Sequence, residues 1–123
     1  MCEMSVRRVV PDIASKDINA SREFYTDLIG LTVGMDMGFV VTLVSPSNPT
    51  AQVTLVRDDG AASVQPNMSI EVADVDEVHA RAVAQGRKIV YPLTDEPWGV
   101  RRFFVADPNG VIINVLSHRP GSA

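Results

Sequence analysis

Hydrophobic and polar positions along the chain predict a strand, then a helix, then three more strands. The apolar, β-branched stretch Val6–Ala14 predicts the first strand, and residues 15–19, Ser-Lys-Asp-Ile-Asn, can cap a helix. Apolar positions then recur at helical spacing, on a stripe made of Ala20, Phe24, Leu28 and Leu31. Gly30 can end this helix. Strands are expected at Leu31–Met35, Phe39–Val44 and Gln52–Val56, with residues 45–50 as a hairpin loop.

The same order of elements is expected a second time. Asn67–Ala73 predicts a strand, and Asp74 followed by Glu77 resembles a capping box at the start of a helix. The apolar stripe of this helix consists of Val75, Val78, Ala82 and Val83, and Gly86 can end it. The last three expected strands are Lys88–Tyr91, Arg101–Ala106 and Val111–Leu116. Residues 107–110, Asp-Pro-Asn-Gly, suit a tight turn between the final two.

The two blocks are spaced as an internal duplication would be. Asp17 and Asp74 are 57 positions apart, and Gly30 and Gly86 are 56 apart. The alternative is a chance alternation of elements in an α+β domain. We favour duplication, which predicts one α+β domain over residues 1–123 with β-α-β-β-β modules at about 6–58 and 67–118.

Composition narrows the class of protein. The 123 residues are 46% hydrophobic and 21% charged, which favours one folded domain with a core of its own. The chain lacks an apolar run of membrane-spanning length and an apolar signal segment, so we expect a cytoplasmic protein that does not enter a membrane. Cys2 is the single cysteine, which agrees with a reducing compartment. The net charge of −4 argues against a nucleic-acid partner.

Two segments carry a family resemblance. Residues 17–30, DINASREFYTDLIG, and residues 96–110, EPWGVRRFFVADPNG, resemble the vicinal oxygen chelate superfamily of glyoxalase I, extradiol dioxygenases, fosfomycin-resistance enzymes and bleomycin-resistance proteins. The resemblance implies a glyoxalase-like fold in which each βαβββ module curls into half of an open barrel. It also implies a homodimer in which modules of two subunits pair around a ligand cleft.

The resemblance also implies where metal-dependent members place their ligands. The corresponding positions here are Val10, Thr54, Asn67 and Asn114, which offer neither a carboxylate nor an imidazole. We therefore expect no metal and no cofactor. A register shift on the strands would bring in Asp12 or Glu71, which together make only half a site.

Strand alternation predicts the lining of the cleft, because residues two apart share a face. The two hairpins are expected to pair Thr54 with Val41 and Asn114 with Phe103. Gln52, Val56, Ser69 and Ile112 are expected to share this inward face. The candidate ligand-binding residues are Asp12, Phe39, Thr54, Asn67, Glu71, Trp98, Phe103 and Asn114.

Several of these side chains have an alternative role. Trp98 either stacks on a planar or cationic ligand or packs its loop onto the barrel or a dimer partner. Asp12 and Glu71 either select a cation or act as general base, or are solvated carboxylates. Asn67 and Asn114 either orient a ligand or are satisfied at the barrel seam.

The histidines and the paired arginines carry weaker signals. His79 and His118 are expected to be exposed, the first off its helix's apolar stripe and the second near the chain end. Of Arg101 and Arg102, which alternate on a strand, one can reach the cleft.

The function expected from these observations is metal-independent binding of a small molecule, an aromatic or cationic natural product, as in the bleomycin-resistance branch. The alternatives are a lyase-, isomerase- or dioxygenase-like enzyme with Asp12 or Glu71 as a metal-free base or metal at shifted positions, and a catalytically silent accessory protein.

Overall fold

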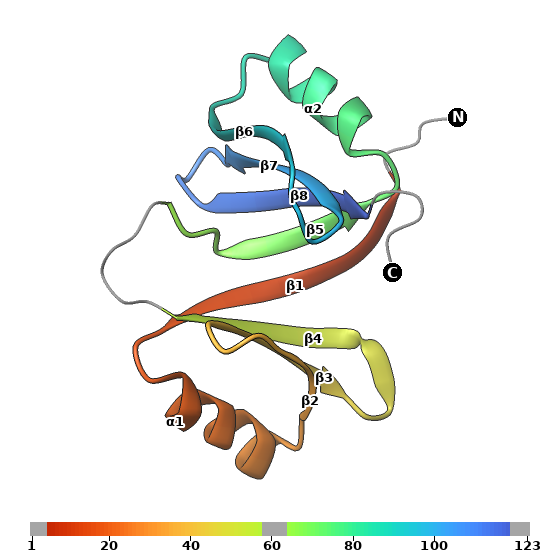
Figure 1. Cartoon of the computed structure of the whole chain (residues 1–123). Helices are drawn as coiled ribbons and strands as arrows, with labels where there is room; N and C mark the ends of the chain where they lie inside the picture. The colour runs from red at the N-terminus through yellow and green to blue at the C-terminus, as the bar shows by residue number, and fades with distance from the viewer. Residues whose placement is uncertain (1–4, 58–63, 119–123) are drawn as a thin grey trace. The chain divides into compact units, whose positions relative to one another are not determined.

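The computed structural model describes residues 5–57 and 64–118. Cys2 and most of the connection between the modules lie outside these residues. The chain forms two compact units: one comprises Val10–Gln65, and the other combines the chain up to Val9 with the chain from Pro66 onward. The expected α+β class and the duplicated β-α-β-β-β order are confirmed (Figure 1).

The N-terminal unit is a mixed sheet with one helical segment. Its elements are β1 (Val6–Ser15, shared with the other unit), α1 (Ile18–Glu23), the π-helical η1 (Phe24–Ile29), β2 (Thr32–Asp36), β3 (Val40–Ser45) and β4 (Asn48–Arg57). The strand order is β2-β3-β4-β1, with β1 parallel to β4 and β3 antiparallel to both neighbours. Its core consists of Val41, Leu43 and Leu55, with Ile13, Ile18, Tyr25, Leu31 and Val53 packed around them.

The apolar stripe predicted for the first helix is wrong in detail. Phe24 and Leu28 are 51% and 69% exposed, whereas Ile18 and Tyr25 pack against the core. Ala20 in α1 is exposed as well, so the predicted stripe is already rotated away from the core before the second half of the helix widens into π geometry, with the Gly30 amide donating to the Tyr25 carbonyl oxygen. Such widening shifts the phase of the side chains away from the 3.6-residue period. Gly30 ends the helix as predicted, at φ +95°.

The C-terminal unit has the same order of elements. They are β5 (Met68–Val72), α2 (Val75–Ala84), β6 (Ile89–Asp95), β7 (Val100–Ala106) and β8 (Ile112–His118), with strand order β5-β8-β7-β6. Asp74 caps α2 by accepting from the Asp76 and Glu77 amides. The helix lies on one face of this sheet (Figure 1), where a core forms from Val72, Val75, Ala82, Phe103 and Val115.

The predicted hairpin registers are each wrong by one residue. Asn114 lies opposite Phe104 rather than Phe103, because Asp107 and Val111 close the turn around a three-residue loop. Thr54 lies opposite Thr42 rather than Val41, since a bulge precedes the β3–β4 turn, which leaves only residues 46–47 outside the strands. A one-residue slip moves a side chain to the opposite face. Phe103 and Val41 therefore belong to the helix-covered cores and not to the predicted cleft.

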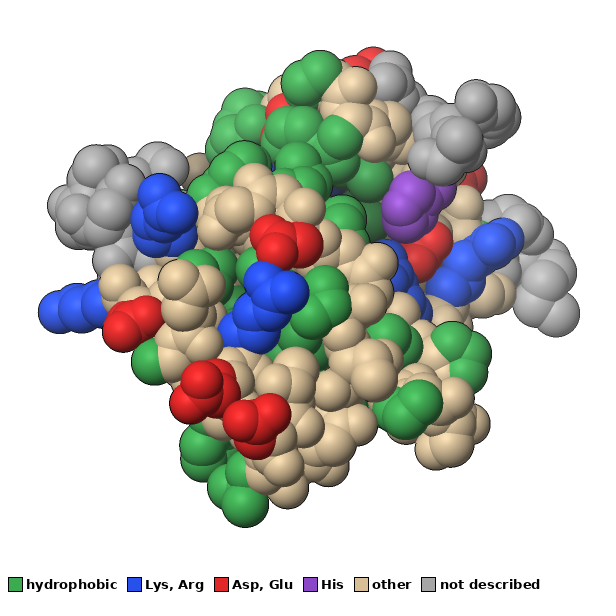
Figure 2. Space-filling model, turned by 60° about the horizontal axis from the view of Figure 1, so that its bottom comes forward, with side chains coloured by type: hydrophobic (Ala, Val, Ile, Leu, Met, Phe, Trp, Pro, Cys, Tyr) green, Lys and Arg blue, Asp and Glu red, His purple; other side chains and the backbone are tan. Residues whose placement is uncertain are grey.

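No helix in the described ranges has both the length and the apolar character needed to cross a membrane. On the face that Figure 2 shows, basic and acidic side chains are mixed, and one sign of charge does not form a stripe there.

Candidate ligand-binding site

The face of the C-terminal sheet opposite α2 carries the residues that could hold a ligand. Strand alternation and the observed register place Ser69 and Glu71 of β5, Asn114 and Leu116 of β8, and Arg102 and Phe104 of β7 on this face. We call it the open face of the C-terminal unit. Asn114, Leu116 and Phe104 are buried, whereas Ser69, Glu71 and Arg102 are half-buried.

Asn114 has an unused acceptor. Its Nδ2 atom donates to Ser69 Oγ at 3.0 Å, and its side chain is held on β8 between the neighbouring strands β5 and β7. Its Oδ1 atom is buried and has no hydrogen-bond partner among the described residues. Buried acceptors are nearly always satisfied in folded proteins, so an unsatisfied one points to a missing donor.

Arg102 lies among three aromatic rings beside that amide. Its guanidinium carbon is 4.9 Å from the centre of the Phe104 ring, 5.2 Å from that of Trp98 and 5.3 Å from that of Tyr91. These are cation–π distances, and they favour a charged guanidinium with aromatic packing on it.

The charge of Arg102 is neutralised by Glu96. The Arg102 Nε atom donates to Glu96 Oε2 at 2.7 Å, and the Tyr91 hydroxyl donates to the same oxygen at 2.8 Å. Glu96 is only 7% exposed, so its carboxylate is matched to these donors. Trp98 in contrast is 54% exposed, which leaves part of its indole surface open to stacking.

Glu71 forms a second charged cluster on the open face. Arg8 Nε donates to its Oε1 atom at 2.9 Å, and His118 Nδ1 lies 2.9 Å from its Oε2 atom. Burial raises the pKa of Glu71, but the hydrogen bond from His118 and the nearby charges of Arg8 and His118 outweigh it, so the pKa is lowered. An ionised, paired carboxylate is a weak proton acceptor, which disfavours Glu71 as general base.

The predicted site residues are distributed over both units. Glu71 and Asn114 lie on the open face, and Trp98 stacks on Arg102 there. Asp12 and Thr54 are register partners in the N-terminal unit, where Thr54 Oγ1 is 3.2 Å from Thr42 Oγ1. Asp12 and Thr54 are on one face of the sheet, and Leu55 and its core are on the opposite face.

The remaining predicted residues do not join the open face. Phe39 precedes β3 and is 54% exposed. Asn67 precedes β5, is exposed, and its Oδ1 atom accepts from the Ile112 amide at 2.9 Å, so this side chain fixes the strand ends. Phe103 is fully buried and contacts His79 edge-on at 4.9 Å, so the expectation that His79 is exposed is also wrong. His118 is exposed as predicted.

Sequence reasoning missed Phe104, Tyr91 and Glu96. The first is adjacent to Phe103, and the expected pairing of Asn114 with Phe103 implies the opposite face for it. Tyr91 and Glu96 approach Arg102 through β6 and the loop after it, and their meeting depends on irregular pairing between β6 and β7. An available signal was Gly110, whose φ of +84° suits the three-residue turn that sets the correct register.

The four positions at which the family resemblance implies metal ligands do not fit a metal here. Val10 has no donor, and the oxygen of Asn67 already accepts from a backbone amide. Thr54 and Asn114 supply neutral oxygens alone, whereas divalent ions in proteins favour carboxylate and imidazole ligands. Within residues 5–57 and 64–118, His, Cys, Asp and Glu nowhere gather in a group of three suited to a metal.

Comparison with solved structures supports the fold. The chain is similar to a glyoxalase/bleomycin resistance protein/dioxygenase superfamily member from Vibrio splendidus, with 20% identity, a TM-score of 0.70, and 92% of this chain and 99% of that one covered. It is similar to methylmalonyl-CoA epimerase from Mycobacterium tuberculosis, with 22% identity, a TM-score of 0.69, and coverage of 94% and 88%. The chain is also similar to a homoprotocatechuate 2,3-dioxygenase variant from Brevibacterium fuscum, with 20% identity and a TM-score of 0.72. This match covers 95% of this chain and 34% of that one.

These likenesses confirm the expected glyoxalase-like α+β fold. No curated protein is significantly similar to this chain in sequence. Residues 6–115 match the model of the Glyoxalase/Bleomycin resistance protein/Dioxygenase superfamily. Because this match covers most of the sequence, the chain belongs to that superfamily.

Proposed function

We propose that this protein binds a small planar molecule on the open face of its C-terminal unit without a metal ion, in the manner of the bleomycin-resistance branch of its superfamily. The observation that carries the proposal is the buried Asn114 Oδ1 atom, which has no partner among the described residues. A ligand N–H or O–H group would satisfy it, and the burial of Phe104 and Leu116 beside it favours an apolar ligand body.

The charges on this face favour a planar aromatic ligand over a cationic one. Glu96 is matched to Arg102 and Glu71 to Arg8 and His118, so neither carboxylate offers an unpaired charge to a cation. The half-exposed indole of Trp98 supplies a stacking surface. The recognised ligand is therefore a flat ring system with at least one hydrogen-bond donor.

A ligand screen tests this proposal directly. Planar aromatic compounds would be added to wild-type protein and to Asn114→Leu in EDTA, with melting temperature and Trp98 fluorescence as readouts. We expect a binder to stabilise the wild type by about 2.7 kcal/mol at a concentration one hundred times its Kd, and to affect Asn114→Leu much less. Stoichiometric divalent metal in the purified protein, with binding lost in EDTA, would contradict a metal-independent site. A screen without any binder would favour the accessory-protein alternative.

A proton-transfer enzyme is the second candidate, and the His118–Glu71 pair favours it. The 2.9 Å contact at Nδ1 orients the imidazole, as carboxylates orient catalytic histidines, and leaves Nε2 to exchange a proton. This changes the candidate base from Glu71 to His118. Turnover of a carbon acid or thiol adduct that is lost in His118→Gln, with ligand binding kept, would support the enzyme; binding without turnover would leave the first candidate.

We also propose that the protein is a homodimer. Phe24, Leu28 and Ile29 of η1 are 51%, 69% and 58% exposed, and such neighbouring apolar side chains are typical of interaction surfaces. In Figure 2 hydrophobic side chains likewise reach the surface in several groups. Sedimentation should give twice the 13.3 kDa chain mass, and Leu28→Lys should reduce it to the monomer. A monomeric wild type at micromolar concentration would overturn this proposal.

A further inference from the structure

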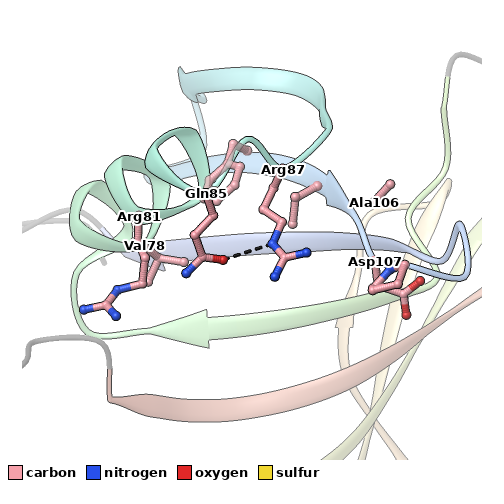
Figure 3. Close-up of a pocket in the computed structure, with 10 residues that line it drawn as sticks. Val78, Arg81, Gln85, Arg87, Ala106 and Asp107 are labelled. Atoms are coloured by element: carbon pink, nitrogen blue, oxygen red, sulfur yellow. Dashed lines mark hydrogen bonds between the residues drawn. The ribbon is translucent and has the colours of Figure 1, made fainter.

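A pocket outside the open face lies between the C-terminal half of α2 and the end of β7 (Figure 3). Its volume is about 290 Å³, close to the lower end of the range for small-molecule sites. Val78 and Ala82 of α2 and Phe103 and Val105 of β7 give it apolar walls. Phe103 and Val105 alternate with Phe104 along β7, so this pocket and Asn114 are on opposite faces of the sheet.

The space exists because small side chains line it. Ala82 and Ala106 leave room that larger residues would fill, and the resulting hollow is open to solvent along its apolar lining. A ligand with an apolar body would remove part of this lining from water.

Two arginines give the rim of the pocket a positive charge. Arg81 is on α2, and Arg87 follows the helix, where its Nε atom donates to Gln85 Oε1 at 3.0 Å (Figure 3). Neither guanidinium forms an ion pair with a described carboxylate, in contrast to Arg8, Arg22, Arg101 and Arg102. An acidic protein thus keeps two unneutralised cations at the mouth of an apolar pocket.

Asp107 is the acidic residue on this rim, and its side chain accepts hydrogen bonds from the adjacent hairpin. Its Oδ1 atom accepts from the Asn109 amide at 2.8 Å and the Val111 amide at 2.9 Å. An anionic group would therefore be repelled at the Asp107 end and attracted at the end where Arg81 and Arg87 lie. This difference in charge between the two ends of the pocket would orient an amphipathic anion with its charged group toward the arginines.

Interaction with the helix dipole is the simpler role for these arginines, because cations near a helix C-terminus stabilise it. That role requires neither an open pocket nor apolar walls beneath the guanidinium groups. We propose that this pocket binds a small carboxylate with a compact apolar body, with the body against Val78 and Val105 and the carboxylate at Arg81 and Arg87. This site is independent of the ligand site on the open face.

A titration followed by ¹H–¹⁵N NMR tests the proposal, with phenylacetate as the probe. Amide shifts are expected at Gln85, Arg87, Val105 and Ala106. Neutral phenylacetamide should bind about 25-fold more weakly, because it loses two charge contacts of about fivefold each. Acetate, which lacks the apolar body, should produce no saturable shifts at these amides.

Variants separate the contributions of charge and shape. Arg81→Gln and Arg87→Gln should each weaken phenylacetate binding about fivefold. Arg57→Gln, an exposed arginine of the N-terminal unit, is the matched control and should leave binding unchanged. Ala106→Leu should fill the pocket and abolish binding, with the remaining amide spectrum reporting that the fold is kept.

Three results would overturn the proposal: no saturable shifts at tens of millimolar phenylacetate, equal binding of phenylacetamide, or shifts confined to the open face around Ser69, Arg102 and Asn114. The last result would assign the probe to the other site.

Discussion

Arg102 and Glu96 are joined by a 2.7 Å ion pair in which the carboxylate side chain is 9% exposed and the guanidinium side chain 22% exposed. The Tyr91 hydroxyl shares the same carboxylate oxygen, and three rings surround the guanidinium. This pair holds the loop that carries Trp98 against the sheet, because Glu96 is the first residue of that loop and Arg102 is on β7.

Removing the charge of Glu96 should destabilise the protein. In Glu96→Gln, Arg102 is left without its counter-ion in a partly buried site, and we expect a loss of about 2 kcal/mol in the free energy of unfolding. Urea denaturation measures this loss. The control is Asp36→Asn in the exposed Arg22–Asp36 pair, which should leave the unfolding midpoint nearly unchanged. Equal effects of the two substitutions would contradict a special role for the buried pair.

Asn114→Leu should separate stability from binding. The substitution removes an acceptor that is unsatisfied among the described residues and gives up one hydrogen bond to Ser69, so unfolding free energy should change by less than about 1 kcal/mol. Ligand affinity should fall at least tenfold. A large loss of stability would mean that Asn114 is a structural residue instead of a ligand contact.

Trp98 should report on the bound ligand. Stacking on the exposed part of its indole would change the emission of the chain's single tryptophan, and Trp98→Ala should weaken binding by about 1–2 kcal/mol, about five- to thirtyfold in Kd. Trp98→Phe keeps an aromatic surface and should lose less. If affinity is unchanged in Trp98→Ala while the melting temperature falls, the indole serves packing on Arg102 alone.

Substitutions of Phe103 and Phe104 should differ in their effects on stability and on ligand affinity. Phe103→Leu changes the core beneath α2 and should reduce stability by about 1–2 kcal/mol without changing ligand affinity on the open face. Phe104→Leu should weaken ligand binding as well, because this ring lies on the open face beside Arg102. The reverse assignment of the two affinity effects would show that the register of β7 is shifted by one residue.

Glu71 should contribute to the fall in unfolding free energy at acidic pH. Its pKa is lowered in the folded protein below the ordinary pKa of a glutamate, so its stabilising effect is fully present above that ordinary pKa and is lost as pH falls through the folded pKa. Unfolding free energies of wild type and Glu71→Gln, measured at pH 7 and again below pH 4, should differ more at pH 7. Glu23→Gln, at an exposed position, is the control. A constant difference across this range would contradict the assignment.

Local sequence signals were enough to predict the order of elements. Asp17 and Asp74 cap the two helices, and Gly30 and Gly86 adopt the positive φ angles that end them. These signals act over a few residues, so they can be interpreted without knowledge of the rest of the chain. The duplicated spacing of the same residues then predicted the modular fold, and the motif resemblance predicted the superfamily.

Only the tertiary structure decided which side chains share a face. Phe103 and Phe104 are chemically alike and adjacent, and one residue of turn geometry at Val111 places the first in the core and the second on the open face. The ion pair of Glu96 with Arg102 likewise depends on irregular strand pairing that no period in the sequence encodes. Capping and periodicity are local properties of the chain, whereas register is a relation between strands distant in sequence. Because successive side chains of a strand point to opposite faces of the sheet, a register error of one residue replaces every side chain of that strand in the candidate site.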